Sequence, residues 1–136
     1  MALEFPSDAW VKALGEGLNA SNGYRAAAKK WEGDLIFVVE KGGVLSDDAY
    51  LYLDLWHGDC RDAYALADAG AKSSEFTLSA PLATWQQVIT GQLDPIKAIM
   101  TKKLGLKGPM TKILKSPRAA LELVKCAGEL DTNWPS

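Results

Sequence analysis

The sequence changes character at Pro81, and this change constrains the possible folds more than any other feature. Before Pro81, short apolar segments alternate with polar residues or run together, which is the pattern of β-strands. The expected strands are 31–40, 50–57, 60–69 and 74–80. After Pro81, apolar residues recur at the spacing of helices. A run of strands followed by a run of helices is typical of an α+β domain rather than of a doubly wound parallel sheet.

The strand patterns also predict which strand lies at the centre. Residues 35–39 are continuously apolar, so we expect this strand to be buried on both faces. In the next strand Leu51, Leu53 and Leu55 share one face, and the other face is half-solvated. Gly58 and Asp59 then predict a tight hairpin turn.

Two helices are expected ahead of the strands. Ser7 and Ser21 are suitable N-cap residues, because a serine oxygen can accept a bond from a free helix N–H. Trp10, Leu14 and Leu18 recur at helical spacing and predict a buried face for the first helix.

The C-terminal half contains clear helix boundaries. Asp94 followed by Pro95 is a helix start, and we expect this helix to span 94–103 after a helix over 82–90 that ends at Gly91. Residues 104–107 form a short edge strand in this interpretation. Two more helices begin at Pro109 and Pro117, with Ser116 as the cap of the second.

A chain of 136 residues is expected to be one domain. We expect residues 1–136 to form this domain with a core over about 7–130, with a loose arm at 1–6 and frayed residues at 131–136. A net charge of −2 argues against nucleic acid as the main partner.

The charge is unevenly distributed along the chain. From Asp94 to Arg118 there are seven basic residues and one acidic residue. This run is either a solvated helix face or a docking patch for an anionic headgroup, a coenzyme phosphate or a membrane surface.

The sequence favours a cytoplasmic protein. Cys60 and Cys126 are too few and too far apart for a disulfide scaffold. We find no signal-peptide pattern, no apolar run of 18 residues and no peroxisomal Ser-Lys-Leu ending.

Residues for catalysis or metal binding are nearly absent. His57 is the only histidine, and with Cys60 it offers two metal ligands at most. A hydrolase would have to use His57, yet no Gly-x-Ser-x-Gly motif presents a serine. A surface cluster of Asp54, His57 and Asp59 is a simpler interpretation than an acid–base site. We therefore expect no enzyme activity, no cofactor and no metal, and the role of His57 stays open.

One stretch of the helical half contains Gly91, Leu93, Pro95, Ala98, Met100, Lys103, Leu104, Leu106, Lys107 and Gly108. In this order and spacing, these residues resemble the sterol carrier protein type 2 family of lipid-binding domains. Weaker similarity lies at residues 31–33, 53–58 and 75–79, so the resemblance covers about 7–130. Thr101 and Pro109 depart from the family pattern beside the expected ligand site.

The resemblance implies a five-stranded, mostly antiparallel mixed sheet covered by helices, with an apolar tunnel between the sheet and the C-terminal helices. The residues expected to bind ligand there are Phe37, Trp85, Ile89, Ile96, Ile99, Met100, Leu104, Met110, Ile113, Leu114, Leu121 and Val124. The residues expected to contact an anionic headgroup or a membrane are Lys97, Lys102, Lys103, Lys107 and Lys112.

The implied function is the non-catalytic binding and transfer of a fatty acid, a fatty acyl-CoA or a sterol-like lipid. Transient contacts with a membrane surface or a lipid-metabolising enzyme fit this function, in a monomer or weak homodimer. The alternative is a structural or oligomerisation module with a closed core that serves a partner enzyme. An apolar stripe has the same appearance in sequence whether it packs on protein or on ligand, so both remain open.

Overall fold

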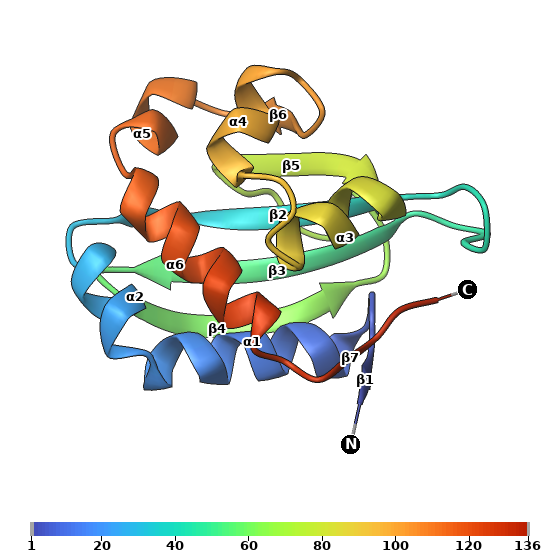
Figure 1. Cartoon of the computed structure of the whole chain (residues 1–136), viewed down its shortest axis with the longest axis horizontal. Helices are drawn as coiled ribbons and strands as arrows, with labels where there is room; N and C mark the ends of the chain where they lie inside the picture. The colour runs from blue at the N-terminus through green and yellow to red at the C-terminus, as the bar shows by residue number, and fades with distance from the viewer. Residues whose placement is uncertain (1, 136) are drawn as a thin grey trace.

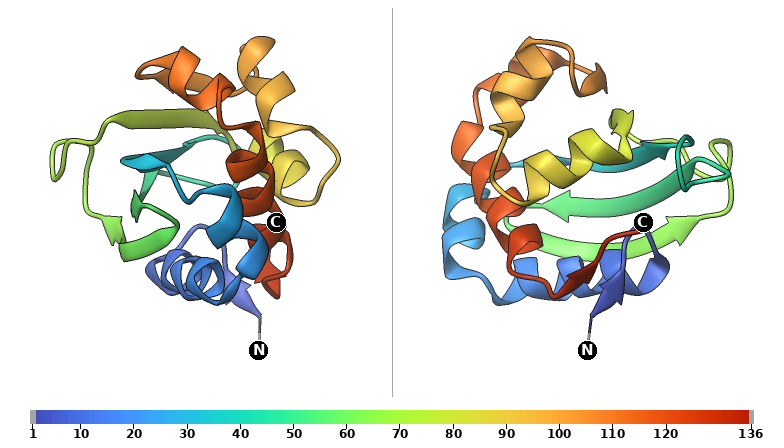
Figure 2. Two further views of the ribbon diagram at one scale, coloured as in Figure 1. Left: turned by 90° about the vertical axis from the view of Figure 1, so that its left-hand side faces the viewer. Right: turned by 45° about the vertical axis from the view of Figure 1, so that its right-hand side comes forward.

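A computed structural model describes residues 2–135 and shows one five-stranded sheet with helices gathered on one of its faces (Figures 1 and 2). The strand order is β4-β3-β2-β5-β6. These strands span β2 Glu32–Glu40, β3 Ala49–Trp56, β4 Asp59–Leu66, β5 Phe76–Pro81 and β6 Gly105–Lys107. All neighbours are antiparallel except β2 and β5, which are parallel. The predicted α+β class with a mixed sheet is confirmed.

The central position of β2 is also confirmed. It lies between β3 and β5, and its Leu35 and Phe37 face the helices. On the opposite face Ile36 is only 5% exposed, because the connection between β4 and β5 passes over it. Burial on both faces explains the continuous apolar run in this strand.

The hairpin between β3 and β4 is placed one residue earlier than predicted. Its turn residues are His57 and Gly58, both with positive φ, 49° and 86°. Asp59 already pairs with Trp56. The strand that follows ends at Leu66 rather than at residue 69.

The first two helices begin at the predicted caps. Helix α1 (Asp8–Ala20) is capped by Ser7, whose hydroxyl accepts from the Trp10 N–H at 3.1 Å. Helix α2 (Asn22–Ala27) is capped by Ser21 in the same way. The predicted face of α1, with Trp10, Leu14 and Leu18, is fully buried.

The expectation of loose chain ends is wrong. Strand β1 (Leu3–Glu4) pairs in parallel with β7 (Thr132–Asn133). Phe5 is 2% exposed, with its ring 4.7 Å from Trp10 and 4.8 Å from Trp134. A few aromatic contacts between distant parts of the chain hold both ends, and no local pattern reveals such contacts.

The C-terminal helices follow the predicted order with shorter bounds. They are α3 Leu82–Ile89, α4 Pro95–Met100, α5 Met110–Leu114 and α6 Pro117–Gly128. Asp94 caps α4 by accepting from the N–H groups of Ile96 and Lys97 at 2.8 and 3.1 Å. This helix ends at Met100 rather than at residue 103, because Lys102 adopts a positive φ of 63°. The Ser116 side chain makes no capping bond, which contradicts its predicted role.

The helical layer and the inner face of the sheet enclose one core. Helix α1 packs on β4, and α3, α4 and α5 contact α6. Within residues 2–135, no helix has the length and apolar character required to cross a membrane.

Candidate functional site

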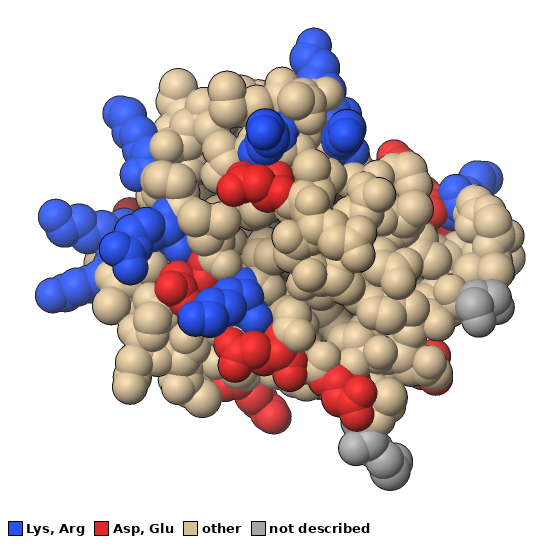
Figure 3. Space-filling view, in the orientation of Figure 1, with Lys and Arg blue, Asp and Glu red and all other residues tan. Residues whose placement is uncertain are grey.

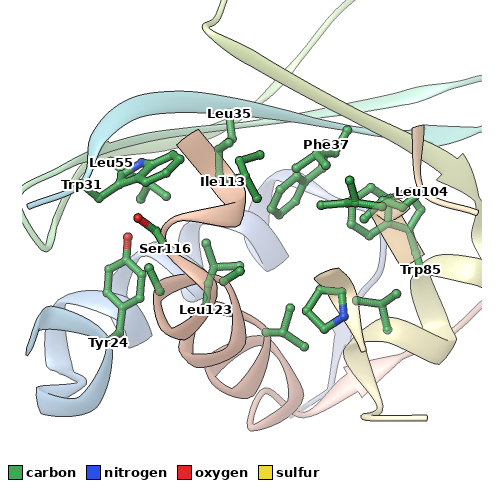
Figure 4. Close-up of a pocket in the computed structure, with 17 residues that line it drawn as sticks. Tyr24, Trp31, Leu35, Phe37, Leu55, Trp85, Leu104, Ile113, Ser116 and Leu123 are labelled. Carbon is green, nitrogen blue, oxygen red and sulfur yellow. The ribbon is translucent and has the colours of Figure 1, made fainter. Parts of the chain in front are cut away.

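A cavity of about 80 Å³ lies in this core, between the inner face of the sheet and the C-terminal helices (Figure 4). The sheet contributes Leu35, Phe37, Leu55 and Leu78 to its wall. The helical half and the segments beside it contribute Trp85, Val88, Pro95, Ile99, Leu104, Ile113, Ser116, Ala119, Ala120, Leu123 and Val124. Tyr24 and Trp31 complete the lining. The wall therefore combines sheet and helix residues from distant parts of the sequence.

The two tryptophans present only their apolar rings to the cavity. The indole N–H of Trp85 donates to the Val38 carbonyl at 2.9 Å, and that of Trp31 donates to the Gly33 carbonyl at 3.0 Å. The Trp85 ring also packs on Phe37 at 5.0 Å. Because both indole N–H groups are already paired, the rings add apolar surface without an unpaired donor.

The polar groups of the lining are the hydroxyls of Tyr24 and Ser116, apart from the two paired indole N–H groups. Burial raises the pKa of Tyr24, so its hydroxyl stays neutral at any physiological pH. Among residues 2–135, no carboxylate, amine or guanidinium lines the cavity. This arrangement suits the binding of an uncharged, apolar body.

The sequence profile of the SCP-2 sterol transfer family matches residues 11–119. The chain belongs to this family. The match covers the five-stranded sheet and all of the cavity wall except Ala120, Leu123 and Val124, and it confirms the resemblance on which the expected fold was based.

Solved structures of sterol carrier proteins superimpose closely on the chain. One, a crystal structure of sterol carrier protein 2, is 41% identical with a TM-score of 0.83, over 91% of this chain and 97% of that chain. A conserved hypothetical protein of Thermus thermophilus, described as a possible sterol carrier protein, is 40% identical with a TM-score of 0.83, over 94% and 90% of the two chains.

A more distant relative shares the fold alone. This is the Aedes aegypti sterol carrier protein 2 in complex with the C16 fatty acid palmitate. It is 16% identical with a TM-score of 0.55, over 86% of this chain and 92% of that chain. The comparison with curated proteins gave no match.

The structure brings half of the expected ligand-binding residues together around the cavity of this sterol carrier domain. The six that line it are Phe37, Trp85, Ile99, Leu104, Ile113 and Val124. Ile89 is buried outside the lining, and Ile96 and Leu114 are half-buried outside it. Met100, Met110 and Leu121 are exposed, at 64%, 41% and 45%. The tunnel and the binding role of every residue in this set stay predictions.

Helical spacing alone does not separate the residues that line the cavity from those that lie outside it. Met100 is the last residue of α4, so it points away from the core once the helix stops short of residue 103. Leu121 lies on the outer side of α6, opposite the buried Leu123 and Ala127. An apolar residue at a helix end or beside a stripe fits the pattern without facing the core.

Sequence analysis missed eleven of the lining residues. They are Tyr24, Trp31, Leu35, Leu55, Leu78, Val88, Pro95, Ser116, Ala119, Ala120 and Leu123. The alternation in β3 and β5 could have indicated Leu55 and Leu78, because alternate residues of a strand share one face. The small residues Ala119 and Ala120 give no such signal, because alanine favours a helix whichever side of it the residue faces.

Basic residues gather along the edge of the molecule formed by α4, α5 and β6, at the top of Figure 3. Lys97, Lys102, Lys103 and Lys107 are exposed there, and none of them forms an ion pair with another residue of 2–135. Their headgroup or membrane role stays a prediction.

Lys112, the fifth expected headgroup contact, already has protein partners. Its amine lies 3.0 Å from the Glu75 carboxylate and donates to the Glu32 carbonyl. It also lies over the rings of Trp31 and Phe76, at 5.4 and 5.7 Å. Lys112 thus fastens α5 to the sheet beside the cavity.

The cluster around His57 consists of separate surface pairs. The His57 ring stacks on Trp56 and lies 2.5 Å from the Glu32 carboxylate. Asp54 pairs with Arg61 and Asp59 with Arg25. Within residues 2–135 no group of histidine, cysteine and acidic side chains could hold a metal ion.

The two cysteines are buried and unbridged. Burial raises the pKa of Cys60 to about 11, so this thiol stays protonated.

Proposed function

We propose that the chain binds hydrophobic ligands in the cavity and transfers them between partners without catalysis. The main support for this proposal is the apolar cavity between the sheet and the C-terminal helices, in a chain that belongs to the SCP-2 sterol transfer family. The candidate ligands are a fatty acid, a fatty acyl-CoA and a sterol-like lipid. The Aedes aegypti protein, solved with palmitate, supports this class of ligand.

The energetics of such binding require no specific polar motif. Each buried methylene contributes about 0.8 kcal/mol, and association costs roughly 4–15 kcal/mol. A chain of roughly 15 methylenes therefore gains about 12 kcal/mol before those costs. The gain is distributed over many apolar contacts, which agrees with a wall built from leucine, isoleucine, valine and aromatic residues.

The cavity must enlarge to admit a long ligand. An engineered cavity of about 150 Å³ holds benzene, so one of about 80 Å³ is too small for a whole lipid. The shortest helix of the wall is α5, with five residues between Pro109 and Pro117. Outward movement of α5 and of the adjacent part of α6 would extend the cavity toward the basic edge.

The basic edge then serves as the docking surface. Exposed lysines 97, 102 and 103 lie within three residues of Met100 in the sequence, and Met100 is 64% exposed. Cations beside an exposed apolar side chain favour an anionic membrane surface or an anionic headgroup. We propose this contact as transient, in a cytoplasmic monomer or weak homodimer, and the low cysteine content of the chain agrees with that compartment.

A pair of substitutions on α6 tests the cavity directly. Val124→Phe puts an aromatic ring into the cavity, whereas Leu121→Phe places the same ring on the outer side of the same helix. Displacing about two ligand methylenes costs roughly 1.6 kcal/mol, which is more than tenfold in affinity. We expect fluorescence titration with a fatty acid to show this loss in Val124→Phe alone.

The same titration decides between the two functions. Thermal unfolding checks that both variants are folded, because overpacking costs about 1–3 kcal/mol. Equal lipid affinity in the two variants would contradict binding in this cavity. Absence of lipid binding in the unmodified protein would favour the alternative function, a structural module with a closed core. The small cavity would then be a packing void.

A further inference from the structure

One end of the cavity carries two hydroxyl groups that have no protein partner. Tyr24 comes from α2 and Ser116 from the turn before α6, and Figure 4 shows both oxygens at the end lined by Trp31 and Leu55. Among residues 2–135 no hydrogen-bond partner of either hydroxyl is found, and Ser116 is half-buried. Tyr24 is 1% exposed, so its hydroxyl reaches only the cavity.

The position of Tyr24 is fixed by its backbone. Its N–H donates to the Ser21 hydroxyl at 3.0 Å, and its carbonyl accepts from the Ala28 N–H at 2.8 Å. The ring is held in the core, and the hydroxyl is directed inward by the helix rather than by a side-chain bond. A phenylalanine ring would pack in the same place. The tyrosine hydroxyl therefore costs free energy of desolvation without improving the packing, and a hydrogen bond to a ligand can offset that cost.

The chemistry of this end favours a neutral ligand oxygen. A tyrosine and a serine hydroxyl can each donate and accept one or more hydrogen bonds. No cation lines the cavity, so a carboxylate placed here would lose its hydration without a charge partner. An alcohol can accept from one hydroxyl and donate to the other, whereas a hydrocarbon leaves both unpaired.

We propose that Tyr24 and Ser116 bind the hydroxyl group of a lipid alcohol, which lies with its oxygen at this end and its apolar body along the cavity. This assignment rests on the proposed lipid-binding function and narrows it to long-chain alcohols. Because burial raises the pKa of Tyr24, the donor is neutral and its contribution does not change between pH 5 and pH 9.

Three ligands of equal chain length test the assignment: 1-dodecanol, dodecanoate and dodecane. Each is titrated into the full chain and followed by tryptophan fluorescence, since Trp31 and Trp85 both line the cavity. We expect dodecanol to bind more tightly than either of the others. One hydrogen bond of ordinary strength corresponds to roughly 2- to 13-fold in affinity.

The decisive variant is Tyr24→Phe, which removes one oxygen and keeps the ring. We expect dodecanol affinity to fall by roughly 2- to 13-fold while dodecane affinity is unchanged. Ser116→Ala should act in the same direction. The matched control is Tyr64→Phe, because Tyr64 packs on Tyr52 outside the cavity and loses the same atom.

The outcomes separate this inference from the proposed function. If Tyr24→Phe leaves the ratio of dodecanol to dodecane affinity unchanged, the assignment is overturned and lipid binding stands. Preference of the unmodified protein for dodecanoate over dodecanol would also overturn it. If none of the three ligands binds, both the assignment and the proposed function fail.

Discussion

At the scale of single residues, a few backbone positions fix the shape of this domain. Gly58 is an example, because its φ of 86° lies in the left-handed region. A Cβ at this position would also lie 2.7 Å from the Arg25 carbonyl oxygen. The turn between β3 and β4 and the docking of α2 against it both depend on the absence of that carbon.

Gly58→Ala should therefore lower the free energy of unfolding. We expect a loss of about 1–3 kcal/mol from the strained backbone, with more from the contact to Arg25. The control is Gly17→Ala in helix α1, where nothing lies within 4 Å of the added carbon. There alanine should raise the stability by about 0.5–1 kcal/mol. Urea unfolding measures both, and a stabilised Gly58→Ala variant would refute the role of this turn.

Residue patterns also show what the sequence could predict about the site. Phe37, Trp85 and Ile99 were assigned to the ligand site and do line the cavity. No local pattern assigns Tyr24 to the site, because nothing near it in sequence indicates that its hydroxyl lies at the same end of the cavity as that of Ser116. Such pairs depend on how α2 and α6 pack, and local spacing carries no information about that packing.

At the scale of elements, the sequence predicted the order and type of helices and strands well. Strong local signals explain this success: Asp94-Pro95 begins α4, and the alternation of leucines marks β3. Predictions failed where long-range contacts decide, as in the pairing of β1 with β7. The observed end of α4 also differs from the predicted end, because the turn at Lys102 replaces a further turn of helix.

Helix α5 is the element on which ligand access depends in this account. It is short, and Lys112 fastens it through Glu75 and the Glu32 carbonyl. Both side chains of the ion pair are about one-third exposed, at 36% and 37%, so solvent screens their attraction. The contribution of the pair to stability is then at most about 1 kcal/mol.

Glu75→Gln should loosen α5 while the domain remains folded. We expect faster hydrogen exchange at the amides of Lys115 and Ser116, which bond to Thr111 and Ile113. Lipid association should become faster as well. Asp54→Asn is the matched control, because it breaks the ion pair with Arg61 at another place on the sheet. Equal exchange of α5 in both variants would show that Lys112 does not fasten the helix.

At the scale of the whole molecule, the cavity and the charge distribution support one function. The helices and the sheet enclose an apolar space, and an edge rich in lysine lies beside α5, the shortest helix of its wall. Exposed Met100 lies within that edge, so Met100→Arg should leave the cavity intact rather than fill it. A carrier needs both a dry interior for its ligand and a surface that meets the donor and acceptor of that ligand.

The most direct test of this account is native mass spectrometry of the freshly purified full chain, followed by solvent extraction of any bound molecule. We predict a discrete excess mass over that of the 14.7 kDa chain, and a lipid in the extract. The account also predicts that a hydroxylated lipid added in equal amount to a fatty acid is retained preferentially. A mass that stays at that of the bare chain after incubation with both lipids would contradict the central claim.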